Sequence, residues 1–322
     1  DHIFRYGDVT VTIEEALKAW TGTLEKVFPT KVKAENRVVE TIVSDKKCTI
    51  KCTKPIAKPR VFIPVFPGTN CEYDLTKAFE DAGAIVHTSV FKNIKPNDVA
   101  NSIEEFARQI KQAQIIMLPG GFSSGDEPDG SGKFIASVFR NLKLKDLIHS
   151  HLYENDGLML GICNGFQALV KTGLLPYGKI MEMDDTMPTL TFNQIARHQS
   201  CMVNTKITSK MSPWFSKVEL GEVFTIPVSH GEGRFVVSEQ MYKELTQNGQ
   251  IATQYVDFDG NASMDINFNP NGSNYAIECI TSPDGRIMGK MGHSERCYRD
   301  IYKNMPGNKD QKLFESGVAY FA

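Results

Sequence analysis

From residue 60 onward, short apolar runs alternate with stretches of helical periodicity. The runs VFIPVF (61–66), IIML (115–118) and LMLGI (158–162) are too short for helices, and segments such as 72–82 and 99–112 between them repeat apolar residues every three to four positions. Apolar strands joined by helical crossovers are typical of a parallel sheet covered on both faces. The pattern therefore predicts an α/β fold with a mostly parallel central sheet flanked by helices.

After about residue 183 the apolar segments become longer and alternate with polar residues. This pattern is typical of strands with one face buried and one face solvated. We expect these segments to add antiparallel strands to the parallel core, at 222–228, 234–237, 251–256 and 275–280.

The first sixty residues differ from the rest of the chain in their pattern of apolar and charged residues. Residues 13–28 follow a helical period, and Thr12 with Glu15 three positions later predicts a capping box at the start of that helix. The run RVVETIV (37–43) predicts a strand, and the Lys/Pro-rich residues 51–60 have no periodicity.

One helix and one strand cannot bury a core of their own. We therefore expect residues 1–50 to be the C-terminal tail of an upstream domain, residues 51–60 a linker, and residues 61–322 the main domain.

Charge and cysteine content exclude several classes of protein. The 322 residues include 36 Lys+Arg and 38 Asp+Glu, a net charge of −2, whereas proteins that bind nucleic acid usually carry a basic excess. No apolar run reaches the ~18 residues of a membrane span. Seven cysteines scattered along a long chain favour a reducing, cytoplasmic location, and Cys48-x3-Cys52 has too few neighbouring ligands for a metal site.

The sequence Gly161-Ile162-Cys163-Asn164-Gly165 lies where an apolar strand meets a helical stretch. A nucleophile on such a sharp bend takes strained backbone angles, and a Cβ on either flanking residue would crowd the turn. The N-terminus of the following helix favours a thiolate, and the Asn164 amide is placed to bind an oxyanion. Cys163 is therefore the candidate nucleophile.

A thiol nucleophile needs a base, and the base needs a carboxylate that orients it. Among seven histidines, His293 follows an apolar strand and a Gly-rich turn, and Glu295 lies two positions later, where both side chains can project from one side of an extended segment. The loop that begins Pro119-Gly120-Gly121 offers backbone N–H groups that can approach an oxyanion closely. It lacks the Lys-Ser/Thr ending of a phosphate loop.

Five fragments together resemble the triad (class I) glutamine amidotransferases. The most similar group is the C-terminal glutaminase region of the phosphoribosylformylglycinamidine synthase family, in its single-chain form, and residues 1–50 resemble the end of the synthetase region that precedes it. The fragments are PVFPGTNCEYD (64–74), LPGGFSSGDE (118–127), GICNGFQAL (161–169), SHGEGRF (229–235) and GHSER (292–296).

This resemblance implies that Cys163 attacks the side-chain amide of L-glutamine. His293 would carry protons, Glu295 would orient His293, and a γ-glutamyl thioester would form and hydrolyse. The N–H groups of Gly121 and Asn164 would form the oxyanion hole.

The resemblance also implies a substrate seat. Gln167 matches a position that helps to hold glutamine. Asn193 and Arg197 match a segment near the α-carboxylate and amino groups of the substrate. His230 would lie near the synthetase interface and help to gate ammonia transfer, although a structural role is equally consistent with the sequence.

Ammonia would then pass to the synthetase, which converts formylglycinamide ribonucleotide to the amidine in purine biosynthesis. The resemblance implies that ATP and Mg²⁺ act in the synthetase domains of the same polypeptide, and that this segment binds no cofactor. Ser124, Phe166 and His198 depart from the family pattern and flank the pocket. Cys71 reads as a small residue near the pocket.

Two other functions remain open from the residues alone. A peptidase-like or deglycase-like cysteine hydrolase would share the bend at Cys163 but would need no partner. A non-catalytic interaction module is the other alternative, although the intact Cys163, His293 and Glu295 argue against it.

Overall fold

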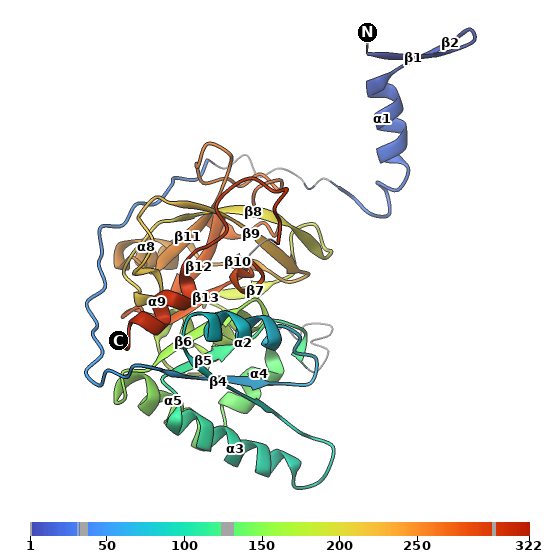
Figure 1. Ribbon diagram of the computed structural model, residues 1–322. Coiled ribbons are helices and arrows are strands. Elements are labelled where there is room, and N and C mark those ends of the chain that lie inside the picture. The colour runs from blue at the N-terminus through green and yellow to red at the C-terminus, as the bar shows by residue number, and fades with distance from the viewer. Residues whose placement is uncertain (1, 31, 33–37, 124–131, 298–300) are drawn as a thin grey trace.

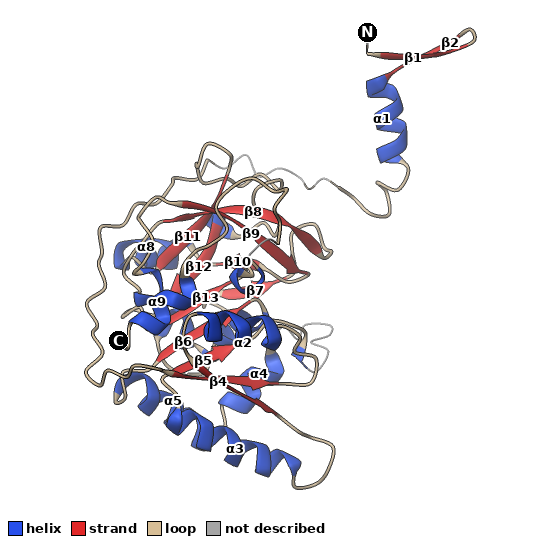
Figure 2. Cartoon of the chain, in the orientation of Figure 1, coloured by secondary structure: helices blue, strands red, loops and turns tan. Residues whose placement is uncertain are grey.

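The computed structural model describes residues 2–30, 32, 38–123, 132–297 and 301–322 (Figure 1). A nine-stranded sheet with helices packed against it forms the main body (Figure 2). In order across the sheet, the strands are β4 (Ile85–Val90), β3 (Arg60–Val65), β5 (Ile115–Leu118), β6 (Leu158–Ile162), β13 (Ile287–Lys290), β12 (Ile277–Thr281), β11 (Ile251–Val256), β8 (Gln199–Ile207) and β9 (Val223–His230).

This sheet has two halves that meet at β13. Pairings from β4 to β13 are parallel, and pairings from β13 to β9 are antiparallel. We call β4, β3, β5, β6 and β13 the parallel half, and β12, β11, β8 and β9 the antiparallel half. A separate pair joins β7 (Thr189–Thr191) to β10 (Arg234–Val236). The predicted α/β class with antiparallel additions is confirmed, and the additions form as many pairings as the parallel strands do.

Helices connect the strands of the parallel half. Three of them, α2 (Glu72–Asp81), α3 (Asp98–Gln112) and α6 (Asn164–Thr172), begin and end within one residue of their predicted bounds. The main body also contains α4 (Lys133–Phe139) and α5 (Leu142–Tyr153) between β5 and β6, α7 (Leu174–Tyr177) after α6, α8 (Glu239–Asn248) before β11, and α9 (Leu313–Ala319) near the C-terminus. Short 3₁₀ turns are η2 (Pro213–Phe215), η3 (Asn274–Ala276) and η4 (Ser294–Arg296).

An aromatic cluster joins α3 to the parallel half. The ring centroids of Phe62 on β3 and Phe106 on α3 lie 5.3 Å apart, and Phe66 and Phe106 lie 5.7 Å apart, both edge to face. All three side chains are fully buried. Burial of apolar side chains supplies most of the driving force for packing a helix on a sheet. This cluster therefore holds α3 against the parallel half.

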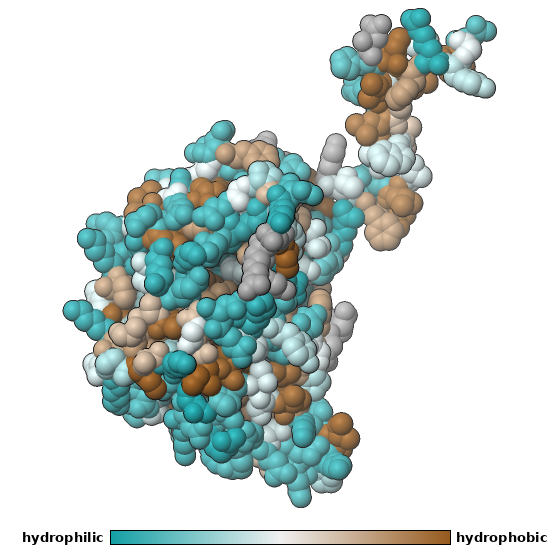
Figure 3. Space-filling model, in the orientation of Figure 1, coloured by the Kyte–Doolittle hydropathy of each residue, from teal (hydrophilic) through white to brown (hydrophobic). Residues whose placement is uncertain are grey.

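Residues 2–28 project away from this body (Figure 1). The strands β1 (Ile3–Tyr6) and β2 (Val9–Thr12) form a hairpin, and α1 (Ile13–Gly22) follows with the predicted capping box between Thr12 and Glu15. The helix ends at Gly22, before the end of the apolar period. None of its residues is buried, and apolar side chains show on the surface of this segment (Figure 3).

Residues 38–50 run over the antiparallel half without forming the strand predicted at 37–43, of which Arg37 lies outside the described residues. Their backbone groups find single partners instead of a ladder. Ile42 donates its N–H to Gln254 Oε1 at 2.8 Å, and Ser44 donates to the Thr208 carbonyl at 2.9 Å. The side chain of Gln254 thus makes a hydrogen bond that a neighbouring strand would make in a sheet. In the described part of the chain, no helix has both the length and the apolar character that crossing a membrane would require.

Candidate active site

Cys163 occupies a strained bend between β6 and α6. Its φ of 53° and ψ of −108° lie where few residues other than glycine are found. A Cβ on Gly165 would lie 2.1 Å from the Leu118 carbonyl oxygen of β5, and one on Gly161 would lie 2.7 Å from Gly165. Both glycines are therefore required, as predicted, because helix and strand approach each other too closely for a side chain.

His293 and Glu295 lie beside this bend because β13 is the parallel neighbour of β6. The carboxyl ends of adjacent parallel strands meet at one edge of the sheet, and Cys163 N donates to the Lys290 carbonyl at 2.9 Å. His293 Nδ1 lies 2.6 Å from Glu295 Oε1, and both side chains are almost completely buried. The structure thus brings the three predicted triad residues together.

The pKa values of this pair move in opposite directions. Burial alone would lower the pKa of His293, but the Glu295 charge and contacts with the Cys163, Cys71 and Glu295 side chains raise it well above its ordinary value. Burial alone would raise the pKa of Glu295, but the charge and hydrogen bond of His293 hold it below the usual range. A charged imidazolium–carboxylate pair is the result.

The Cys163 thiol has a second polar neighbour besides His293. Cys163 Sγ lies 3.7 Å from the Ser229 carbonyl, and His293 Nε2 has no hydrogen-bond partner among the described residues. Catalytic hydrogen bonds often tighten only when substrate is bound.

Gly120 leaves room for the triad. A Cβ at this position would lie 2.9 Å from His293 Cε1, 3.0 Å from Cys71 Sγ and 3.4 Å from Cys163 Cβ. Gly120 is therefore the point at which the loop after β5 touches the nucleophile, the base and a second thiol. Any side chain here would push these groups apart.

Gly121 has a positive φ of 128°, and a Cβ there would lie 2.7 Å from the Gly68 carbonyl oxygen. The bridge between this loop and the loop after β3 uses its neighbours, since Phe122 N donates to Gly68 O and Asn70 N donates to Gly120 O. The N–H of Gly121 takes no part in these bonds.

Asn164 is the first residue of α6, at the end of the helix where the helix dipole is positive. Its Oδ1 accepts from Ser123 N at 3.3 Å, and its Nδ2 donates to Gln167 Oε1 at 2.9 Å. Gln167 Nε2 in turn donates to the Glu232 carbonyl at 2.5 Å. Residues 124–126 of the oxyanion loop lie outside the described residues.

A small cavity opens beside the thiol. Its volume is about 40 Å³, enough for a few water molecules, whereas ligand sites usually enclose about 300–1,000 Å³. The lining residues are Gly121, Phe122, Cys163, Asn164, Gln167, Ser229, His230, Gly231 and Glu232. In this conformation the described residues leave little room beside the thiol.

Asn193 is buried and fully occupied by protein partners. Its Nδ2 donates to the carbonyls of Arg197 and His230, and its Oδ1 lies 3.1 Å from His230 Nδ1 and accepts from Gly233 N. It therefore ties residues 193–197 to the loop after β9. Arg197 Nε has no hydrogen-bond partner among the described residues.

His230 lies in the buried wall of the small cavity. Burial, together with the charges of His293 and His198, lowers the pKa of His230 to about 3, so the ring is neutral. Because Asn193 Oδ1 accepts from Nδ1, Nε2 is left as a hydrogen-bond acceptor, and it has no partner among the described residues.

Cys71 lies closer to the triad than its reading as a small pocket residue suggests. Its Sγ is 3.9 Å from His293 Nδ1, and it accepts a hydrogen bond from Arg296 Nη2 at 2.9 Å. Both residues are in sequence motifs quoted above, but the sequence held no signal of their contact, because it depends on α2 packing against η4.

Cys71, His293 and Glu295 offer sulfur, nitrogen and oxygen atoms within 4.8 Å of one another. Zinc accepts such a donor set. Here, however, His293 Nδ1 is already bonded to Glu295, and the Arg296 guanidinium beside Cys71 repels a cation. The three residues suit a proton-transfer pair better than a metal.

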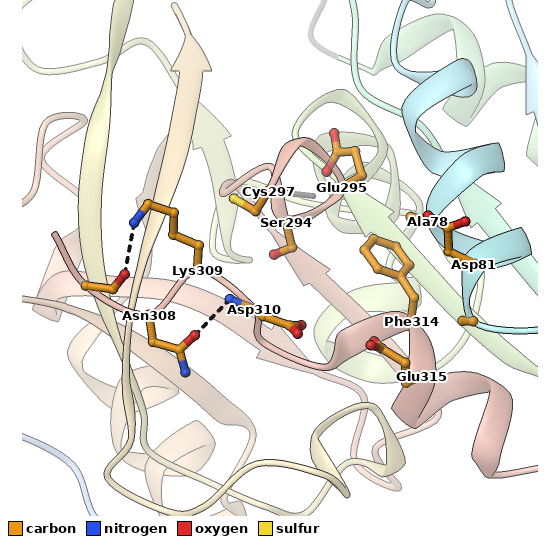
Figure 4. Close-up of a pocket in the computed structure, with 12 residues that line it drawn as sticks. Ala78, Asp81, Ser294, Glu295, Cys297, Asn308, Lys309, Asp310, Phe314 and Glu315 are labelled. Atoms are coloured by element: carbon orange, nitrogen blue, oxygen red, sulfur yellow. Dashed lines mark hydrogen bonds between the residues drawn. The ribbon is translucent and has the colours of Figure 1, made fainter. Parts of the chain in front are cut away.

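A larger cavity of about 470 Å³ lies on the other side of the catalytic loop (Figure 4). Ser294 and Glu295 form part of its wall. The remaining lining residues come from α2, from residues 297–310 and from α9, and are Ala78, Asp81, Ala82, Cys297, Gly307, Asn308, Lys309, Asp310, Phe314 and Glu315.

Comparison with known proteins places this geometry in a family. Residues 58–321 match the CobB/CobQ-like glutamine amidotransferase domain. The phosphoribosylformylglycinamidine synthase subunit PurQ of Methanococcus maripaludis strain C5 is 35% identical over 247 residues, which cover 76% of this chain and 85% of the relative. PurQ of Aquifex aeolicus is 31% identical over 245 residues, which cover 76% of this chain and 93% of that protein.

A solved structure shows the same fold. The PurLQS structure from Thermotoga maritima contains a chain that is 26% identical, with a TM-score of 0.59, and the match covers 82% of this chain and 100% of that one. A cysteine at a strand–helix bend, a buried His–Glu pair beside it and a sequence match over residues 58–321 agree with one another. The chain belongs to the CobB/CobQ-like glutamine amidotransferase family.

Proposed function

We propose that this protein hydrolyses L-glutamine and supplies the ammonia to a synthetase that converts formylglycinamide ribonucleotide to formylglycinamidine ribonucleotide in purine biosynthesis. The observation that carries this proposal is the meeting of Cys163 with the buried His293–Glu295 pair in a family whose relatives are named phosphoribosylformylglycinamidine synthase subunits.

Cys163 is the nucleophile. Its sulfur bonds to the amide carbon of glutamine, and the C–N bond breaks as His293 gives a proton to the leaving ammonia. His293 then takes a proton from water, which attacks the γ-glutamyl thioester and releases glutamate and the free thiol. Glu295 holds the ring and stabilises its charged form throughout.

Backbone N–H groups stabilise the charge that develops on the amide oxygen. Gly121 follows β5 and Asn164 follows Cys163 at the start of α6, so the backbone N–H groups of both residues lie on the edge of the sheet that carries the thiol. Gln167 is oriented by Asn164 and the Glu232 carbonyl and helps to seat the carboxamide.

Arg197 binds the α-carboxylate of glutamine, since its Nε is buried and without a partner in the described part of the chain. Asn193 contributes by holding Arg197 and the loop of His230 in place. The His230 ring is neutral, and its Nε2 accepts a hydrogen bond from ammonia or from the substrate. Through this contact His230 helps to gate the transfer of ammonia.

The small cavity supports coupling to a partner. A space of about 40 Å³ is small for glutamine, and we expect the site to widen when the substrate binds. We expect the synthetase, with its own ligands bound, to favour the wider state, and we expect weak activity from this chain alone.

The synthetase belongs to the same polypeptide. Residues 1–57 lie outside the matched family domain, and the apolar side chains of the N-terminal hairpin and α1, such as Phe4 and Trp20, are exposed. Residues 1–50 are the tail of that synthetase, 51–60 the linker and 61–322 the amidotransferase. ATP and Mg²⁺ act in the synthetase, and the seven free thiols support a cytoplasmic location.

Labelling with acivicin, an electrophilic glutamine analogue, followed by mass spectrometry of the full chain tests this function. We expect modification at Cys163, protection by glutamine, and no labelling of Cys163→Ala. Labelling elsewhere, or hydrolysis of peptides or glycated substrates in place of glutamine, would establish one of the alternative hydrolases. A folded chain that neither reacts nor turns over glutamine with its synthetase would indicate a non-catalytic module.

A further inference from the structure

A buried ion pair lies directly behind the catalytic loop. Lys290, the last residue of β13, and Glu278 on the neighbouring β12 have fully buried side chains, with Lys290 Nζ 3.6 Å from Glu278 Oε1. Neither residue touches the cavity beside Cys163. The proposed mechanism uses neither charge.

This pair holds the backbone on both sides of His293. Lys290 Nζ donates to the Gly292 carbonyl at 3.1 Å and to Ser294 Oγ at 2.8 Å, while Glu278 Oε1 accepts from Gly292 N at 2.8 Å. Both residues adjacent to the catalytic imidazole therefore depend on the pair for their orientation.

The same lysine holds the nucleophile through its backbone. The Lys290 carbonyl accepts from Cys163 N at 2.9 Å. One residue thus sets the position of the Cys163 amide with its main chain and the position of the His293 loop with its side chain. Moving Lys290 would change the separation of sulfur and imidazole.

The network extends into the antiparallel half of the sheet. Thr253 on β11 donates to Glu278 Oε2 at 2.5 Å. Ser294 Oγ donates to Gln311 Oε1 at 2.6 Å, and Gln311 Nε2 donates to Thr205 Oγ1 on β8 at 3.2 Å. The catalytic loop is therefore anchored to three antiparallel strands by polar contacts.

Stability alone is a weak reason for such a pair. Removing two charges from water costs several kcal/mol for each ion, and apolar residues of similar volume often replace a buried pair without loss of stability. The contacts here converge on the two neighbours of His293 and on the amide of Cys163. We therefore expect the contacts of the pair to position His293 relative to Cys163.

We propose that Lys290 and Glu278 are positioning residues that fix the distance between Cys163 and His293. This inference rests on the proposed glutaminase function, because it assigns Cys163 and His293 their roles. Neither residue touches substrate, and each acts through the loop of residues 291–296.

The test is a double variant, Lys290→Met with Glu278→Gln, made in the full chain. Methionine keeps the length of the lysine side chain without its charge, and glutamine keeps an oxygen that accepts from Gly292 N. No charge is left unpaired, so we expect the variant to fold, which circular dichroism and thermal unfolding would check.

The readout is the rate of Cys163 labelling by acivicin as a function of analogue concentration and pH. We expect the maximal rate to fall about 100-fold, as misplacement of a catalytic group by about 1 Å can cause. The half-saturating concentration should change less than about twofold, since no residue that contacts the analogue has changed. Because the contact with Cys163 is one of those that raise the pKa of His293, its loss should move the limb of the profile that reports His293 to lower pH.

A matched control uses the ion pair at the other end of the same strand. Arg286, next to β13, lies 3.3 Å from Asp156, and both side chains are largely buried. The double variant Arg286→Met with Asp156→Asn should lower the unfolding temperature without altering the pH profile or the labelling rate by more than about twofold. A general loss of rigidity would affect both variants alike and would contradict the proposal.

Labelling of the Lys290/Glu278 variant at the wild-type rate and with the wild-type profile would overturn the inference while leaving the glutaminase function intact. Failure of the wild-type chain to be labelled at Cys163 would instead overturn the function itself. If the double variant does not fold, Ser294→Ala removes one Lys290 contact and is expected to slow labelling about threefold to tenfold. An unchanged rate in a folded Ser294→Ala chain would then count against the proposal.

Discussion

The two halves of the central sheet contribute to the site in different ways. Strand β5 of the parallel half ends at the loop of Gly120 and Gly121, and β6 ends at the bend at Cys163, so these strands carry the groups that we propose act on substrate. The antiparallel half provides support, since β9 accepts from His293 N through the Pro227 carbonyl and β12 contributes Glu278. His293, the proposed base, lies three residues after the end of β13, the strand where the halves meet. The proposed catalytic residues thus lie where the two halves meet. The parallel half positions the thiol, and the antiparallel half positions the loop of His293.

The largest effect is expected in the parallel half, from Gly165→Ala. The added methyl group would lie 2.1 Å from the backbone of β5, so β5 and α6 must separate or the chain must unfold. We expect a loss of more than about 4 kcal/mol in the free energy of unfolding, or no folded protein. Denaturant unfolding measures this.

Gly231→Ala, after β9, is the control for Gly165→Ala, because a Cβ there meets nothing within 4 Å. Its stability should change by less than about 0.5 kcal/mol. Equal losses in the two variants would show that the close approach at Gly165 does not distinguish the two halves.

At the junction, Glu295→Gln should lower the maximal labelling rate of Cys163 about 10³–10⁴-fold, because His293 loses its orienting charge. The stability difference from the wild type should also depend on pH. Because the pKa of His293 is raised in the folded protein, its stabilising contribution is complete below pH ~6.5 and is lost as the pH rises through that raised pKa. Because the pKa of Glu295 is lowered, its stabilising contribution is complete above pH ~4.3.

The gap in unfolding temperature should therefore be widest between about pH 4.5 and 6.5 and should narrow in alkali. Thermal unfolding at several pH values measures it. A gap that is constant over this range would mean that the pair is not ionised.

A smaller effect is expected in the antiparallel half, from Gln254→Leu. Gln254 accepts from Ile42 N and donates to the carbonyls of Glu40 and Tyr275. Its loss should cost about 1–3 kcal/mol because these groups stay buried without partners, and amide exchange of residues 38–46 should accelerate. The rate at which Cys163 is labelled should stay within about twofold of the wild-type rate. A larger change would show that the antiparallel half affects the reactivity of Cys163 as well as the stability of the fold.

The smallest effect is expected outside both halves, from Trp20→Ala on α1. This side chain is 80% exposed and contributes nothing to the core of the amidotransferase. The free energy of unfolding of the main body should change by less than about 0.5 kcal/mol, as measured in denaturant. A larger loss would show that α1 packs on the main body in solution.

Local patterns in the sequence predicted much of the fold and part of the site. The bend at Cys163 could be predicted because its glycines and strand–helix setting are adjacent in sequence, and Thr12 with Glu15 predicted a cap for the same reason. The strand at 37–43 was wrong for residues 38–43, because Gln254, more than 200 positions away, supplies the hydrogen bond that a neighbouring strand would have made.

Contacts between distant segments were not visible in the sequence. The pairing of Cys71 with Arg296 and of Glu278 with Lys290 depends on which strands and helices become neighbours. Sequence order does not reveal this, since β13 lies beside β6 in the middle of the sheet although the paired residues Met159 and Ile287 are 128 positions apart.

The central claim is that Cys163, held by its bend beside His293, attacks the carboxamide of glutamine. Acid-quenched single-turnover mixtures of the full chain and glutamine, digested and analysed by mass spectrometry, test it most directly. The account predicts a γ-glutamyl group on the peptide that contains Cys163, and none in Cys163→Ala. An acyl group on the peptide that contains Cys71, or glutamine turnover that persists in Cys163→Ala, would contradict it.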